Sequence, residues 1–226
     1  MITKTTLTLS VIIAFIVGGI IGYNISYISP INPNGQNGLL IATAINAGAD
    51  KQIALYKTMR KLWSDHVFWT REYIVDALNG SPATNATSDR LMKNQEDIGN
   101  AITTYYGADV GNKLTTLLKE HISIAVDIVS AAKANDQAKF KDENIRWQDN
   151  ADQIAVFLSQ ANPNWPKATL KDMMRIHLST TIDELDAVLS EQYDKSVTAF
   201  DAVLNHILNM SDALSSGIIK QFPDKF

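Results

Sequence analysis

Histidine and methionine are the side chains in this sequence best suited to hold a ligand. Met174 and His177 lie three residues apart and His206 and Met210 lie four apart, so each pair would share one face of a helix. Imidazole with thioether suits copper, particularly Cu(I), and buried histidines on facing helices can also bind iron or a non-covalent haem. The candidate metal ligands are therefore His66, His121, His177, His206, Met174 and Met210.

Two of these histidines are predicted to point into the protein. With about 100° of turn per helical residue, Met59 and Leu62 share the face of His66, and Leu117 shares the face of His121. His177 is predicted to lie at the edge of an apolar stripe, and His206 is predicted to lie on a face of small residues. A second interpretation stays open, because a core histidine is commonly held by one hydrogen bond and methionine is an ordinary core residue.

Three amide side chains accompany the inward histidines. Asn94, Gln95 and Asn150 project near the apolar stripes of the predicted helices. Buried amides need hydrogen-bond partners, so we expect a polar network that links them to His66 and His121. Such a network could set the packing register of the helices or hold a ligand.

Motifs of the common enzyme classes are missing from the sequence. It has no Gly-x-Ser-x-Gly nucleophile motif, no phosphate-binding glycine loop, no His-Glu-x-x-His motif and no cysteine. Without cysteine, disulfides, thiolate zinc sites and covalently attached haem are excluded. Carboxylates such as Asp183 and Glu184 are expected on solvated helix faces. We therefore predict that the protein is not an enzyme.

The charge of the chain argues against nucleic acid as a partner. Its 226 residues carry a formal net charge of −4, and lysine and arginine are dispersed along the sequence. Binding to a phosphate backbone needs a concentrated positive surface, which this chain does not encode.

The N-terminus is predicted to be a membrane anchor. Residues 5–49 contain no charged side chain, and Thr5 to Tyr23 supply roughly the twenty residues that a helix needs to cross a bilayer. A cleaved signal peptide is the alternative, but its cleavage motif would be Ala42-Thr43-Ala44, far beyond the apolar core. Because Lys4 precedes the span, we expect a cytoplasmic N-terminus and an extracytoplasmic C-terminal domain at the cell membrane.

Gly18 and Gly22 lie four residues apart within this predicted span. This spacing allows two membrane helices to approach closely, although glycine is also common in membrane helices generally. The pair could bind a second copy of the chain or another transmembrane subunit. We therefore expect an interaction or accessory subunit of a membrane complex, with a metal-binding or haem-binding bundle as the alternative.

The rest of the chain is predicted to be all-α. The predicted organisation is an anchor (1–28), a polar linker (29–38) and a bundle domain (39–226). In the bundle, apolar residues recur every three or four positions, and turn residues divide predicted helices of about 50–78, 88–106, 108–133, 136–160 and 166–221, the last with a weak break near 194–196. Short connections between long helices indicate an up-and-down bundle of four to six helices. We identify no internal repeat.

Several stretches resemble a known group of proteins. "LWSDHVFWTREYI", "NQEDIGNAI", "GNKLTTLLKEHI", "ANPNWP" and "GIIKQFPDKF" are similar to a family of small, all-helical bacterial and archaeal proteins with no established activity. The resemblance covers about residues 62–226 and leaves the anchor outside. It implies a single helical unit and assigns no functional residue.

Overall fold

The computed structural model describes the backbone of residues 36–226 and the side chains of residues 47–226. The chain divides into two compact units, 1–40 and 41–226, and the second is the helical domain described below. The predicted anchor, with Gly18 and Gly22, and most of the predicted linker lie outside the described residues. Among the described helices, none combines the length and the apolar character that a bilayer crossing requires.

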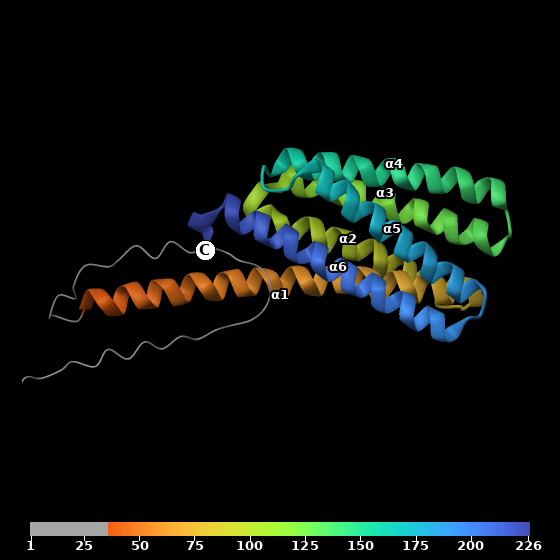
Figure 1. Cartoon of the computed structure of the whole chain (residues 1–226), viewed down its shortest axis with the longest axis horizontal. Coiled ribbons are helices and arrows are strands. Elements are labelled where there is room, and N and C mark those ends of the chain that lie inside the picture. Colours follow the sequence, from red (N-terminus) through yellow and green to blue (C-terminus); the bar gives the residue numbers. More distant parts are fainter. Residues whose placement is uncertain (1–35) are drawn as a thin grey trace, which may run out of the picture. The chain divides into compact units, whose positions relative to one another are not determined.

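The described chain is entirely helical, which confirms the all-α prediction. Six α-helices follow one another, with a short 3-10 turn at the C-terminus (Figure 1). Their bounds are α1 (Gln36–Asn79), α2 (Thr84–Tyr106), α3 (Ala108–Lys133), α4 (Gln137–Ala161), α5 (Lys167–Leu189) and α6 (Tyr193–Gln221), followed by η1 (Pro223–Lys225). The up-and-down bundle is therefore built from the largest number of helices that we predicted.

Three boundaries differ from the sequence prediction, and one of them is the start of α2, which lies at Thr84 instead of about residue 88. Helix α1 already begins at Gln36, so the last three residues of the predicted linker are helical. The weak break predicted near 194–196 is a complete turn at 190–192, and it separates two antiparallel helices. This turn depends on Glu191, whose φ of 57° is left-handed and stops the helix. Glutamate rarely adopts that conformation, so the sequence carried no signal for it.

The turns between α1 and α2, α3 and α4, and α5 and α6 have the same geometry. Each contains one residue with positive φ: Gly80 (68°), Asn135 (54°) and Glu191 (57°). In all three turns, the next residue donates its backbone N–H to the carbonyl five residues earlier, at 2.9 Å. This pattern closes the C-terminus of the first helix in each pair.

These turns mark a threefold internal repeat. Each left-handed residue follows a histidine by 14 positions, and the three histidines, His66, His121 and His177, are 55 and 56 residues apart. The domain is thus three copies of one helical hairpin, and α1, α3 and α5 run in the same direction (Figure 1). The expectation of no repeat was wrong, because the copies share the chemical character of their positions and few identical residues.

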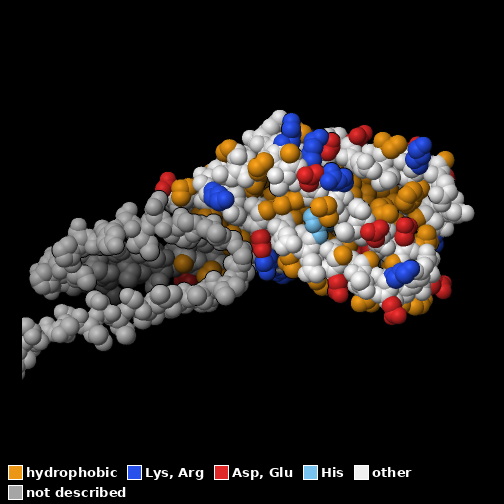
Figure 2. Space-filling model, in the orientation of Figure 1, with side chains coloured by type: hydrophobic (Ala, Val, Ile, Leu, Met, Phe, Trp, Pro, Cys, Tyr) orange, Lys and Arg blue, Asp and Glu red, His pale blue; other side chains and the backbone are white. Residues whose placement is uncertain are grey.

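Equivalent positions of the three hairpins build the core in layers. The residues seven before, three before and eight after each histidine are all buried and apolar. These layers consist of Met59, Leu114 and Leu170, then Trp63, Leu118 and Met174, and finally Ile74, Val129 and Leu185. On the visible surface, acidic and basic side chains are interspersed (Figure 2).

Candidate metal site

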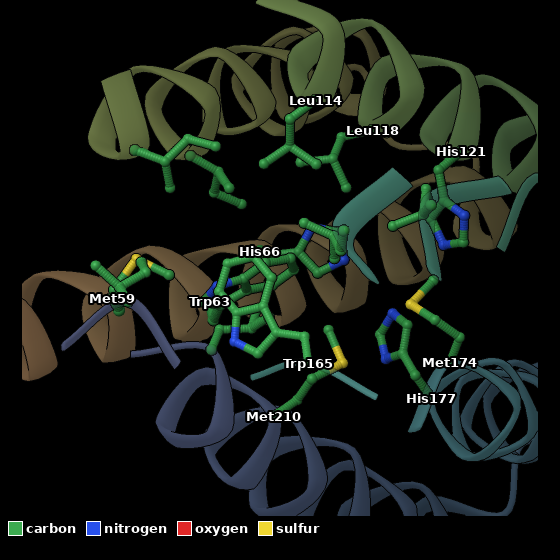
Figure 3. Close-up of a pocket in the computed structure, with 16 residues that line it drawn as sticks. Met59, Trp63, His66, Leu114, Leu118, His121, Trp165, Met174, His177 and Met210 are labelled. Atoms are coloured by element: carbon green, nitrogen blue, oxygen red, sulfur yellow. The ribbon is translucent and has the colours of Figure 1, made fainter. Parts of the chain in front are cut away.

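Three histidines at equivalent repeat positions converge in the core. His66 on α1, His121 on α3 and His177 on α5 are 2%, 2% and 4% exposed. Their rings project from three helices toward a shared space (Figure 3). The sequence placed the first two inside but put His177 at the edge of an apolar stripe. The repeat explains its burial, since His177 occupies the position of the other two.

The rings are close together without being bonded. The ring centroids of His66 and His177 are 5.6 Å apart, and those of His121 and His177 are 6.1 Å apart. Within residues 47–226, no hydrogen bond joins two of these rings. Two imidazoles that share a metal have ring centres about 5 to 6.5 Å apart, because each metal–nitrogen bond is about 2 Å long. In each of these two pairs, the distance between the rings therefore suits one shared metal ion.

The three rings line a small apolar cavity together with other core residues. About 20 Å³ is open to the centre of a water-sized sphere, enough for one water molecule or ion. A haem does not fit unless the helices move apart. Of the described side chains, no aspartate, glutamate, lysine or arginine lines the cavity, whereas Met174 and Met210 both do. The cavity thus offers neutral imidazole and thioether groups in an apolar wall.

Two of the histidines are held by hydrogen bonds from the second helix of their own hairpin, which is α4 for His121 and α2 for His66. His121 Nδ1 is 2.8 Å from Asn150 Oδ1, and Asn150 Nδ2 donates to the carbonyl of Leu117 at 3.2 Å. His66 Nδ1 is 3.2 Å from Gln95 Nε2. These contacts confirm the predicted polar network.

The remaining amide, Asn94, anchors the first hairpin. Its Nδ2 donates to the carbonyl of Leu62 at 3.0 Å and its Oδ1 accepts from Gln95 at 3.2 Å. Two ring nitrogens, His121 Nε2 and His177 Nδ1, are buried and have no hydrogen-bond partner among the described residues.

Burial keeps the three imidazoles neutral. It lowers the pKa of His66 to about 3, with a further lowering by His121 and a partial reversal by the Gln95 hydrogen bond. It lowers the pKa of His121 to about 4, against a raising effect of Asn150. Burial and then the neighbouring histidines hold the pKa of His177 well below its usual value. Neutral imidazole is the form that binds metals.

His206 lies apart from the other three. Its Nε2 is 2.8 Å from the carbonyl oxygen of Met173, and it is not among the residues that line the cavity. In the repeat it occupies the position of Gln95 and Asn150, 29 residues after the central histidine. The predicted ligand set is therefore divided: the cavity brings together His66, His121, His177, Met174 and Met210, whereas His206 braces the third hairpin.

Met174 separates the cavity from the surface. It is 5% exposed and lies one helical turn before His177 on α5. Besides the cavity it also lines an open groove of about 580 Å³ between α4 and α5, together with Asp149, Asp152 and Asp183. One flexible side chain thus stands between this groove and the histidines.

The sequence prediction for Glu184 was wrong. This carboxylate is 1% exposed and forms an ion pair with Arg71, whose Nη1 lies 2.5 Å from Oε1. Arg71 Nη2 also donates to Ser196 Oγ at 3.0 Å. Burial raises the pKa of Glu184, and the Arg71 guanidinium partly reverses this effect. The pair joins helices α1, α5 and α6, through the contact of Arg71 with Ser196, and lies outside the cavity.

Trp165 is a wall of the cavity that the sequence interpretation did not identify. It belongs to the loop between α4 and α5, is 5% exposed and lines the cavity. The surrounding "ANPNWP" lies between the predicted helices of about 136–160 and 166–221. Nothing in the local pattern shows that the indole of a loop residue turns into the core.

A complete coordination shell is not preformed. Among the described residues, no three His, Asp or Glu side chains are arranged as a ready metal centre. Binding of one ion by all three rings would therefore require the rings to change position.

In comparisons with known proteins, no family model, no curated protein and no solved structure matches this chain.

Proposed function

We propose that this protein binds one copper ion, as Cu(I), between His66, His121 and His177. The observation that carries the proposal is the convergence of one histidine from each of three equivalent hairpins, with ring centroids 5.6 and 6.1 Å apart. Three neutral imidazoles from three helices supply a trigonal set of ligands, and the cavity between them has room for one ion.

The polarity of the cavity favours a monovalent ion. A divalent cation in an apolar site carries a large desolvation cost unless carboxylates or thiolates offset its charge. The described residues place no such group on this cavity. Cu(I) carries a single charge and accepts imidazole and thioether ligands. Zinc and Fe(II) also bind imidazole, but they carry two charges and are less suited to a thioether ligand.

Met174 is the best-placed thioether for a fourth ligand. It lies three residues before His177 on α5 and is drawn between the rings of His121 and His177 (Figure 3). Met210 lines the same cavity from α6, on the side of Trp165 in this view. A methionine that can change its rotamer can complete the shell without movement of the backbone.

Cu(I) titration against a chromophoric chelator, under anaerobic and reducing conditions, tests the proposal on the full chain in detergent. We expect one Cu(I) per chain and an X-ray absorption spectrum with two or three nitrogen neighbours and a sulfur. His121→Gln should weaken binding at least tenfold. His206→Gln is the matched control and should not, because this histidine lies outside the cavity. No binding by the wild type, or equal binding by a variant with all three central histidines replaced by glutamine, would overturn the proposal.

A second proposal concerns location and rests on the sequence alone. We infer that residues 1–28 anchor the bundle as an extracytoplasmic accessory subunit of a membrane complex, with Gly18 and Gly22 facing a partner helix. The charge-free stretch of residues 5–49 supports it. Cross-linking in native membranes should yield a specific adduct that Gly18→Leu abolishes. A monomer that washes from membranes at high salt would contradict it.

A further inference from the structure

In two of the three hairpins, the residue 29 positions after the central histidine contacts Nδ1 of that histidine. In the second hairpin this residue is Asn150. Its Nδ2 donates to the carbonyl of Leu117 at 3.2 Å, which fixes the amide so that Oδ1 faces His121 Nδ1 at 2.8 Å. A carbonyl oxygen only accepts, so His121 carries its proton on Nδ1. Its Nε2 is left as a lone pair, buried and without a partner among the described residues.

In the first hairpin the equivalent residue, Gln95, has the opposite effect. Its Nε2 donates to the carbonyl of Leu91 at 2.8 Å, which places the amide nitrogen against His66 Nδ1 at 3.2 Å. An amide nitrogen cannot accept, so a proton on His66 Nδ1 would oppose the hydrogens of Gln95, and the ring proton therefore lies on Nε2; the two amide hydrogens are shared among Leu91, Asn94 and His66. Gln95 Oε1 is buried with no partner in the described part of the chain.

In the third hairpin, no amide contacts Nδ1 of the central histidine. His206 stands at the equivalent position but contacts the carbonyl of Met173, and His177 Nδ1 has no partner among residues 47–226. No hydrogen bond at Nδ1 therefore fixes the tautomer of His177. The three histidines occupy one repeat position, but the partner of Nδ1 differs: an amide oxygen for His121, an amide nitrogen for His66 and no described atom for His177.

We propose that Asn150 and Gln95 are positioning residues that hold His121 and His66 in opposite tautomers, one ready for a metal ion and the other blocked. This step rests on the proposed copper site. Copper first binds His121 Nε2 and His177. His66 joins only when its proton moves from Nε2 to Nδ1 and the Gln95 amide turns over, so that Oε1 accepts a hydrogen bond from Nδ1–H. No proton leaves the protein, but the turn gives up the hydrogen bonds that Gln95 Nε2 donates to the carbonyl of Leu91 and to Asn94 Oδ1, so Gln95 opposes binding by His66.

Long-range ¹H–¹⁵N spectra of the metal-free full chain, labelled with ¹⁵N-histidine, test the tautomers without copper. We expect His121 as the Nδ1–H form and His66 as the Nε2–H form. Asn150→Leu should leave His121 as a mixture of tautomers, whereas Asn150→Asp keeps the acceptor and should keep the Nδ1–H form. The matched control Gln148→Leu, which changes an exposed amide on the same helix as Asn150, should change neither. An Nε2–H form of His121 in the wild type would overturn the assignment.

Copper affinity tests the positioning role with effects of opposite sign. Asn150→Leu should weaken Cu(I) binding about 10- to 100-fold, as loss of a residue that orients a ligand does. Gln95→Met removes the block on His66 and should leave affinity equal or higher. Equal losses in both variants, with native helix content by circular dichroism, would contradict the proposal. A wild type that binds no Cu(I) would instead refute the copper site, while the metal-free spectra still decide the tautomers.

Discussion

Gly217 on α6 lies directly against the indole of Trp165. A Cβ atom at position 217 would come 1.9 Å from Trp165 Nε1 and 2.5 Å from Cδ1. Trp165 is buried and forms part of the wall of the histidine cavity. Because residue 217 has no side chain, the loop between α4 and α5 can place the indole of Trp165 directly against α6.

Gly217→Ala should destabilise the protein by up to about 2 kcal/mol net. A ring packed on all sides cannot move away from a new methyl group without strain, which costs about 1–3 kcal/mol, and alanine returns about 1 kcal/mol as the better residue in a helix interior. Urea unfolding measures the difference. Ser216→Ala, next to it on the same helix and half-buried, is the control and should change stability by less than about 0.5 kcal/mol. A Gly217→Ala variant as stable as the wild type would show that Trp165 is loosely held.

Sequence periodicity predicted the helices well where residue types carried the signal. Helix α3 has the predicted bounds, 108–133, because Gly107 and Asn135 are recognisable ends. The end of α5 was missed because Glu191 adopts a conformation that its residue type does not announce. The repeat was missed for a related reason, since its positions are conserved in burial and geometry and seldom in identity.

Arg71→Met should cost about 2–3 kcal/mol at pH 7, because it leaves the carboxylate of Glu184 buried without its cation. The loss should shrink as pH falls toward 5. Burial raises the pKa of Glu184, so its carboxyl protonates and becomes neutral well before an exposed glutamate would. Where Glu184 is neutral, at pH values below its raised pKa, its burial costs little. The free energy of unfolding then falls as pH rises through that pKa and the carboxylate becomes charged. Urea unfolding at pH 7 and pH 5 measures both values.

Lys61→Met is the control for this ion pair. Lys61 bonds Asp65 at 2.5 Å, but the lysine side chain is 71% exposed, so removing it should cost less than about 1 kcal/mol. The double variant Arg71→Met/Glu184→Gln should recover much of the loss from Arg71→Met, since no charge then remains buried. Equal losses in the single and double variants would mean that Arg71 stabilises the bundle by packing alone, including its contact with the ring of Phe200.

The central histidines should make the protein acid-sensitive. The pKa of His66 is about 3 and that of His121 about 4, against about 6.5 in an unfolded chain. Between these values the unfolded state binds more protons, so the free energy of unfolding falls as pH drops below about 6.5. Each histidine contributes up to about 1.4 kcal/mol per pH unit, and the raised pKa of Glu184 opposes part of this slope.

Denaturant unfolding at pH 7, 6 and 5 measures this slope before most carboxylates titrate. His121→Gln removes one of the buried titrating groups and should flatten the dependence while lowering stability at pH 7. A wild type whose free energy of unfolding is constant between pH 7 and pH 5 would show that the histidines accept protons in the folded state.

The candidate site was only partly accessible from the sequence. Helical phasing found His66 and His121, and the amides near them, because each lies on a clear apolar stripe. It gave no reason to separate His206 from His177, since both stand near methionines at helical spacing. Only the packing of α5 against α6 shows that His206 bonds a backbone carbonyl and that His177 faces the cavity.

Glu191→Gly should stabilise the protein by about 1 kcal/mol. Glu191 has a φ of 57°, a conformation that costs an ordinary residue about 1–2 kcal/mol and a glycine almost nothing. The equivalent position of the first hairpin is already glycine, and Gly80→Ala should lose a similar amount. Ser190→Gly is the matched control: its φ is −87°, so glycine there brings only the entropy cost and should destabilise slightly. Thermal and urea unfolding measure all three, and a Glu191→Gly variant that loses as much stability as Ser190→Gly would refute the strain at this turn.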